Sequence, residues 1–248
     1  MLQIHLLDVF ALGWLLACWI GYTYFSAHKS RTTASLVFAM RLYRREWFTR
    51  VLQHENRIAD VAALGSLLTG ATFFASTAIL ILGGLVALLG ATNRVVEVVA
   101  ELPFTLPETE AFSRIKIVLL IGMFVYAFFK FTWSIRQYHF CSVLVGAAPV
   151  THAPHDHDDY IDTMTQVSSY AAEDFNQGLR TFYFALAALA WFFHPWLSVC
   201  GSAFVVYVLY QREFRSRTLI ALARLRAEHL PVEATTSATP SKHSLASQ

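Results

Sequence analysis

Four long stretches of the chain carry almost no charge and show no regular alternation of polar and apolar positions. They span approximately residues 6–27, 61–92, 115–136 and 179–211. A bilayer core about 30 Å thick needs about 20 helical residues to cross it. In lipid, only a helix satisfies all of its own backbone hydrogen bonds. The pattern therefore predicts an all-α, polytopic helical membrane protein, with residues 1–230 forming a single membrane domain.

The fourth stretch is interrupted by Pro195. The aromatic residues around it, WFFHPW at 191–196, resemble an interfacial belt in which the proline opens a new helix. Two interpretations remain open. Residues 179–194 and 196–211 form a hairpin that crosses twice, or they form one span kinked at the proline. The chain then has five or four crossings.

Basic residues in the connectors predict the orientation. The first connector holds seven of them, and none precedes the first apolar stretch: Lys29, Arg31, Arg41, Arg44, Arg45, Arg50 and Arg57. Because short cytoplasmic loops are enriched in Lys and Arg, this connector should face the cytoplasm of a bacterial inner membrane, with the N-terminus outside. Five further arginines follow Tyr210, so we expect the C-terminus to be cytoplasmic as well. That expectation requires the hairpin.

Two basic segments outside the spans have helical amphipathicity. Residues 36–52 place Leu36, Met40, Tyr43, Trp47 and Val51 on one face, and arginines on the others. This pattern is typical of an interfacial helix on the inner membrane surface, and a packed soluble helix is the alternative. Residues 214–230 repeat the pattern more weakly. Residues 231–248 lack large apolar groups, so we expect a disordered tail.

Composition narrows the class of function. Hydrophobic residues make up 56% of the chain and charged residues only 15%, which argues against a soluble enzyme. The net charge of +2 gives no reason to expect nucleic acid. The three cysteines form no CxxC pair, and the chain contains no phosphate-binding, nucleophile-elbow or dinucleotide motif. We expect no cofactor.

Small residues recur along one face of the second stretch. The positions concerned are Thr69, Thr72, Ser76, Gly83 and Gly90. Small groups allow close approach of another helix, and hydroxyls hydrogen-bond across such contacts. The spacing predicts a packing seam, within the subunit or between subunits. The alternative is that the hydroxyls line a path for ions or water.

The third stretch carries an unexpected cation at Lys130. This residue shares a face with Tyr126, Trp133 and Gln137, and such a polar face should point away from lipid. Lys130 either extends to the headgroups or pairs with a carboxylate at position 173, 174 or 60. The predicted intramembrane polar network comprises Lys130, Trp133, Arg136, Gln137, Glu173, Asp174, Asn176 and Arg180.

A short histidine-rich segment is the candidate metal site. His152, His155 and His157 lie among three aspartates, and both residue types bind Zn²⁺ and similar ions. Short clusters of this kind are more often solvated surface. No pair of membrane-proximal histidines is visibly matched for a haem.

Several motifs taken together resemble a known family. They read FFASTAIL at 73–80, YAFFKFTWSIRQY at 126–138, FNQGLR at 175–180 and YFA at 183–185. The chain from about residue 7 to 215 is similar to an uncharacterised family of bacterial and plant membrane proteins, domain of unknown function 599. The resemblance implies a multi-span helical membrane protein of unassigned activity. It transfers no catalytic or ligand-binding residue.

The expected function is therefore that of an integral membrane protein that acts without covalent chemistry. It is an oligomeric or accessory subunit of a larger membrane complex, in contact with membrane lipid and not with nucleic acid. A small channel or transporter-like protein is one alternative. A metal- or haem-binding membrane enzyme is a second.

Overall fold

The computed structural model describes residues 2–32, 35–100, 110–151 and 153–222. These residues form helices and contain no strand, which confirms the all-α prediction. The helices are α1 (Leu2–Thr32), α2 (Leu36–Val51), α3 (Ile58–Gly90), α4 (Thr92–Ala100), α5 (Glu110–Ala147), η1 (Pro154–His157), α6 (Asp158–Leu189), η2 (Ala190–Phe192) and α7 (Pro195–Phe214). The predicted tail at 231–248 lies outside the described residues.

Three helices of the described part of the chain are long and apolar enough to cross a membrane. The apolar spans are Leu6–Ser26 in α1, Ile58–Gly90 in α3 and Glu110–Ala147 in α5. They match the first three predicted stretches. The fourth differs, because α6 begins at Asp158 and not near residue 179. Its first half carries several acidic residues, so α6 as a whole is amphipathic.

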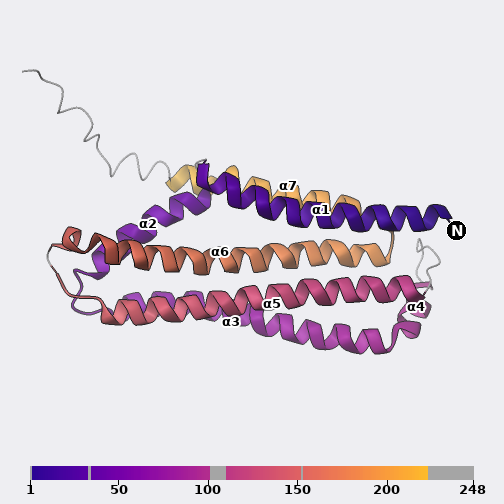
Figure 1. Cartoon of the computed structure of the whole chain (residues 1–248), viewed down its shortest axis with the longest axis horizontal. Coiled ribbons are helices and arrows are strands. Elements are labelled where there is room, and N and C mark those ends of the chain that lie inside the picture. The colour runs from indigo at the N-terminus through magenta and orange to yellow at the C-terminus, as the bar shows by residue number, and fades with distance from the viewer. Residues whose placement is uncertain (1, 33–34, 101–109, 152, 223–248) are drawn as a thin grey trace, which may run out of the picture.

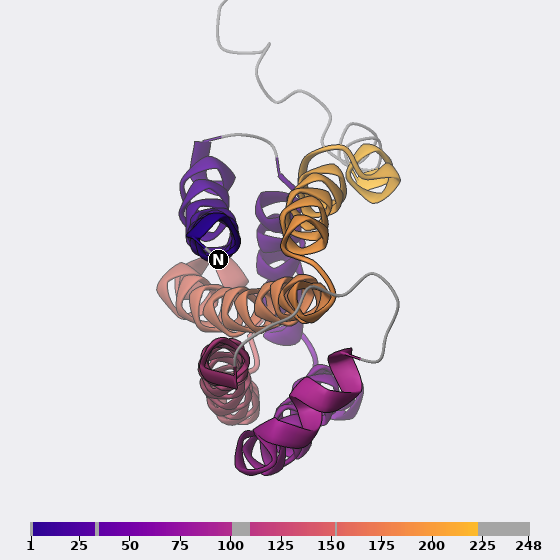
Figure 2. The same ribbon diagram turned by 90° about the vertical axis from the view of Figure 1, so that its right-hand side faces the viewer.

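The long helices lie side by side in three layers (Figures 1 and 2). Helix α6 forms the middle layer, with α1 and α7 on one side of it and α5 and α3 on the other. Helix α6 packs mainly against α5, with further contacts to α7, α2 and α1. Helix α3 packs mainly against α5, and so lies at the periphery.

The chain reverses direction at Pro195, and α7 runs back along α6 (Figure 1). Pro195 occupies the first turn of α7, and the side chain of His194 accepts a hydrogen bond from the backbone of Trp196. A Cβ atom added to Gly201 would lie 3.5 Å from Ala187 Cβ, an ordinary contact between the two helices. Helices α6 and α7 are therefore antiparallel, as a hairpin requires, and a single helix kinked at Pro195 is wrong. The number of membrane crossings stays a prediction.

Helix α2 packs against α6 through part of its surface, and its expected position on the membrane surface stays a prediction. Its Phe48 and Val51 are fully buried in a core with Ile161 and Met164 of α6. Helix α6 begins about twenty residues earlier than the predicted fourth stretch, and this added part carries the apolar surface that covers one face of α2. Arg45 adds two ion pairs to the start of α6, at 3.1 Å to Asp158 and 2.8 Å to Asp162. Of the second predicted basic helix, only the part up to residue 222 is described.

Candidate functional site

Lys130 on α5 forms an ion pair with Asp174 on α6. The Lys130 ammonium lies 2.9 Å from Asp174 Oδ1, and Gln137 Nε2 donates to Asp174 Oδ2 at 2.6 Å. Asp174 is buried, so α5 supplies a donor to each of its carboxylate oxygens. This pair is one of the three that the sequence predicts for Lys130. The alternative, in which the Lys130 side chain extends to the lipid headgroups, is wrong. Asp60 instead accepts a 2.7 Å hydrogen bond from the indole of Trp47.

Close approach of α5 and α6 brings these short side chains together. Gly178 follows Asp174 by one turn, and a Cβ atom there would lie only 2.6 Å from Phe131 Cε1. The hydroxyl of Ser134 also donates to the backbone carbonyl of Ala171 across the same contact, at 2.7 Å. Glycine at 178 therefore sets the helix separation that the Lys130–Asp174 pair requires.

Arg180 belongs to a separate network on another side of α6. Its guanidinium lies 3.0 Å from Glu213 Oε2 of α7 and donates to the hydroxyl of Ser26 at 2.7 Å. Tyr22 and Ser26 of α1 also donate to the Glu213 carboxylate, at 3.0 and 2.5 Å. Residues six apart on a helix differ by about 240° in direction. The prediction that Arg180 belongs to the same polar network as Lys130 is thus wrong.

The other predicted members of the network lie around the Lys130–Asp174 pair or beyond it. The Arg136 guanidinium lies 5.3 Å from the centre of the Trp133 ring and 5.5 Å from that of Phe140, on the exposed side of α5. Glu173 is exposed, and Asn176 is half-buried on α6, one turn before Arg180. The predicted set therefore separates into three parts: the half-buried Lys130 with the buried Gln137 and Asp174, the exposed residues around them, and the Arg180 network.

A third polar cluster, absent from the sequence analysis, lies at the opposite end of the helices. Lys116 on α5 donates to the Trp191 carbonyl at 3.0 Å, and the Trp191 indole donates to Asp8 at 2.8 Å. The Lys116 ammonium is 3.9 Å from Asp8, with side-chain exposures of 4% and 6%. Asp8 lies near the start of the first apolar stretch and Lys116 near the start of the third, and both stretches start on the same side of the membrane in the predicted topology. This shared level is the sequence feature that could have predicted their contact.

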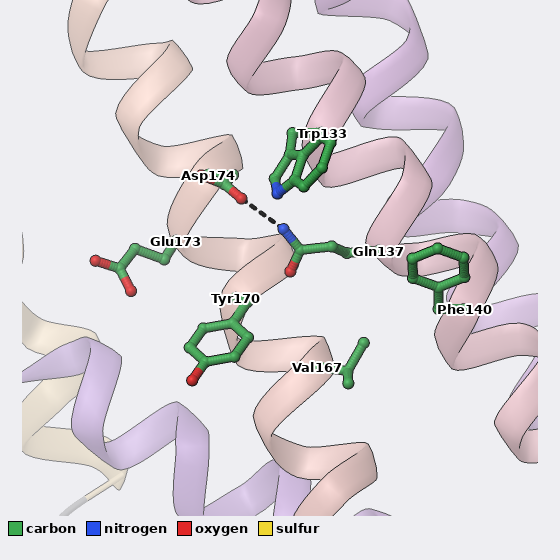
Figure 3. A pocket seen from close by; sticks show the side chains of 7 residues that line it. All are labelled: Trp133, Gln137, Phe140, Val167, Tyr170, Glu173 and Asp174. Carbon is green, nitrogen blue, oxygen red and sulfur yellow. Dashed lines mark hydrogen bonds between the residues drawn. The ribbon is translucent and has the colours of Figure 1, made fainter.

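A groove between α5 and α6 opens beside Asp174 (Figure 3). Its volume is about 410 Å³, and we call it the α5–α6 groove. It is lined by Trp133, Gln137 and Phe140 of α5 and by Val167, Tyr170, Glu173 and Asp174 of α6. Three aromatic rings and two carboxylates thus surround a space of small-molecule size.

The predicted seam on α3 faces outward. Thr69, Thr72, Ser76, Gly83 and Gly90 are exposed. The hydroxyls of Thr69 and Thr72 donate to carbonyls within α3 itself, at 2.8 and 2.9 Å. Helix α3 contacts α5 through the opposite face, which carries Leu64, Ala71, Ala75, Ala78 and Leu85. The prediction that this seam packs against another helix of the same chain is therefore wrong for the described helices. Packing of the seam between subunits stays a prediction.

The histidine-rich segment receives no support as a metal centre. Among the described residues, no three His, Cys, Asp or Glu side chains lie close enough to hold a metal ion. His152 lies outside those residues, as does the side chain of His155. His157 precedes the first residue of α6.

Comparison with known families agrees with the motifs. Residues 10–218 match the model of a family described as "Protein of unknown function, DUF599". The chain belongs to this family. No curated protein and no solved structure matches it. DUF599 carries no assigned activity, so any argument about function rests on the geometry of the helices.

Proposed function

We propose that this DUF599 protein is a multi-pass membrane subunit that acts without covalent chemistry and associates with other membrane helices through the outer face of α3. The observation that carries the proposal is the contrast between two surfaces. The charged groups between the helices are paired within the chain, in Lys116–Asp8, Lys130–Asp174 and Arg180–Glu213. The outer face of α3, in contrast, presents small residues that no described helix covers.

The proposed topology has five crossings, formed by α1, α3, α5, the second half of α6, and α7. The N-terminus of α1, the start of α5 and the turn between α6 and α7 lie at one end of the molecule (Figure 1). The other end carries α2 and the basic first connector. Placing that basic end in the cytoplasm of a bacterial inner membrane satisfies the positive-inside rule, with the N-terminus outside.

A channel within one subunit is less well supported than an assembly role. A conducting path needs polar groups or water along its whole length. Lys116 and Lys130 are separated by about 21 Å along α5. Between them, Leu120, Phe124 and Ala127 are buried among apolar side chains, with exposures of 1%, 3% and 0%. This apolar layer separates the two polar levels.

The outer face of α3 has the composition of a helix-packing surface. A Cβ atom added to Gly83 or Gly90 would meet no atom within 4 Å, so a partner helix has room to approach. Phe73 and Leu80 flank the small residues and are 64% and 77% exposed. Small residues beside large apolar ones allow close packing in lipid, where van der Waals contact drives association.

Cysteine cross-linking in native membranes tests the proposal. In a background with Cys18, Cys141 and Cys200 changed to alanine, Ser76→Cys should form a covalent product with a second copy or with another membrane protein on mild oxidation. The matched control is Phe204→Cys, at an exposed position on α7. Equal cross-linking of both variants, or none at Ser76→Cys, would contradict the assembly role of α3.

A further inference from the structure

The α5–α6 groove contains a buried acceptor to which no described residue donates. Gln137 is 8% exposed, and its Nε2 is committed to Asp174. Its Oε1 accepts no hydrogen bond from the described residues. Figure 3 shows this oxygen directed away from Asp174, on the side where Tyr170 lies. An acceptor left in this way costs free energy unless a ligand supplies an N–H or O–H group.

The groove is also flanked by two opposite charges that form no ion pair with the described residues. Lys130 pairs with Asp174, so Glu173 is the remaining negative charge on the α6 side. The Glu173 carboxylate accepts a hydrogen bond of 3.5 Å from the side-chain amide of Gln177. Arg136 stands over the Trp133 and Phe140 rings on the α5 side. Neither Glu173 nor Arg136 forms an ion pair with a described residue, and both are exposed. The charges of the two acidic and two basic side chains around the groove therefore sum to zero. The remaining negative charge lies on α6 and the remaining positive charge on α5.

This arrangement matches a zwitterion that carries a primary ammonium and a phosphate. A primary ammonium has three N–H groups, enough to serve the Glu173 carboxylate and Gln137 Oε1 together. A phosphate pairs well with the guanidinium of Arg136. The neighbouring aromatic rings suit the ammonium and its methylene groups. Trp and Tyr are also the residues enriched where a membrane meets water.

We propose that the α5–α6 groove binds the headgroup of phosphatidylethanolamine from the surrounding membrane. The ammonium lies between Glu173 and Gln137, and the phosphate lies against Arg136. Arg136 ends the third predicted span, at 115–136, so the groove opens at headgroup level on the basic side of the protein. An anionic lipid lacks the cation for Glu173. A choline lipid has no N–H to give Gln137.

Native mass spectrometry of the intact detergent-purified protein tests this assignment. The protein is mixed with equal amounts of phosphatidylethanolamine, phosphatidylcholine and phosphatidylglycerol that carry the same acyl chains, distinguished by headgroup mass. The amount of phosphatidylethanolamine bound to the wild type should be about ten times the amount of phosphatidylglycerol. This is the ratio expected from one charge-assisted hydrogen bond. The wild type should also prefer the ethanolamine lipid to the choline lipid.

Two variants and a control connect the preference to the groove. Glu173→Gln should bring the ethanolamine-to-glycerol ratio close to one. Arg136→Gln should weaken retention of all three lipids, because each carries the phosphate that Arg136 contacts. Asp159→Asn, at another exposed acidic position on α6, should keep the wild-type ratio. Thermal unfolding of each variant shows whether its fold is intact. If Glu173→Gln does not fold, Arg136→Gln still tests the groove through its contact with the lipid phosphate.

Equal retention of the three lipids by the wild type would overturn the proposal. An unchanged preference in Glu173→Gln would do the same. Free phosphoethanolamine distinguishes the source of the headgroup. If the free compound displaces the lipid and binds as well as the lipid does, the groove takes a soluble solute and the lipid assignment is wrong. The α3 cross-linking result is independent of all these outcomes.

Discussion

The ion pair between Arg180 and Glu213 joins two helices that are consecutive in the chain and antiparallel in space. The groups lie 3.0 Å apart and are both almost completely buried. This pairing needs α7 to return along α6, which the turn at Pro195 provides. The C-terminal end of α7 is thereby carried back to the end of the molecule where α2 lies (Figure 1), and the Tyr43 hydroxyl of α2 donates to the Leu222 carbonyl at 3.1 Å.

The first prediction concerns topology. Reporter fusions after Gln248 and within residues 41–57 should report the same compartment, because five crossings place both segments on the cytoplasmic side. A reporter that is active only in the cytoplasm and another that is active only outside, used in parallel, give opposite readings at each site. If the two sites lie in opposite compartments, the assignment of five crossings is wrong.

The second prediction concerns the Lys130–Asp174 pair. Lys130→Met leaves a buried carboxylate without its cation, so it should lower the free energy of unfolding by about 3 kcal/mol. The double variant Lys130→Met with Asp174→Asn should lose less, because no uncompensated charge remains. Thermal unfolding in one detergent measures both. Additive losses in the double variant would show that the two groups act independently.

The third prediction concerns Gly178. In Gly178→Ala, the new methyl group meets the Phe131 ring, and we expect a loss of about 1–3 kcal/mol, typical of overpacking. Phe131→Leu in the same chain should recover part of the loss. Gly201→Ala is the matched control, since its Cβ atom would make an ordinary contact of 3.5 Å and should cost little. Equal destabilisation of the two alanine variants would argue against the close α5–α6 contact.

Local patterns in the sequence predict most of the fold. Charge-free stretches locate α1, α3 and α5, and the proline within an aromatic cluster indicates the hairpin. The start of α6 was missed because its acidic first half resembles a loop when apolar runs are the signal. The apolar surface of α6 that covers one face of α2 was missed for the same reason. An amphipathic helix shows only that its apolar face is covered, and not whether lipid or protein covers it.

Pairing of polar groups is harder to predict than helix positions. Lys130 stands out because a cation inside a span needs compensation, and only a few carboxylates were within reach. Arg180 was assigned to the wrong cluster because sequence proximity to Asp174 was taken as spatial proximity, although the two residues face different helices. Asp8 and Lys116 are far apart in sequence, so their contact depends on the arrangement of α1 beside α5 and α6.

The last prediction concerns Arg57, whose side chain contacts the C-terminal end of α5. Its guanidinium donates to the carbonyls of Val145, Ala148 and Pro149 at 3.1, 2.6 and 3.0 Å. These carbonyls lie at a helix C-terminus, where a cation is also favoured by the helix dipole. Arg57→Gln should therefore cost about 1.5–3 kcal/mol, the range for hydrogen bonds to a charged group.

Hydrogen exchange measured by mass spectrometry locates the effect of Arg57. Peptides covering residues 140–150 should exchange faster in Arg57→Gln than in the wild type, while peptides from α1 should be unchanged. The matched control is Arg50→Gln, which removes an exposed ion pair to Glu46 within α2 and should alter exchange at 140–150 very little. If both variants speed exchange equally, or neither does, Arg57 does not secure the end of α5. A selective effect of Arg57→Gln would show that the first connector, through one arginine, fixes the end of a helix almost ninety residues away in the chain.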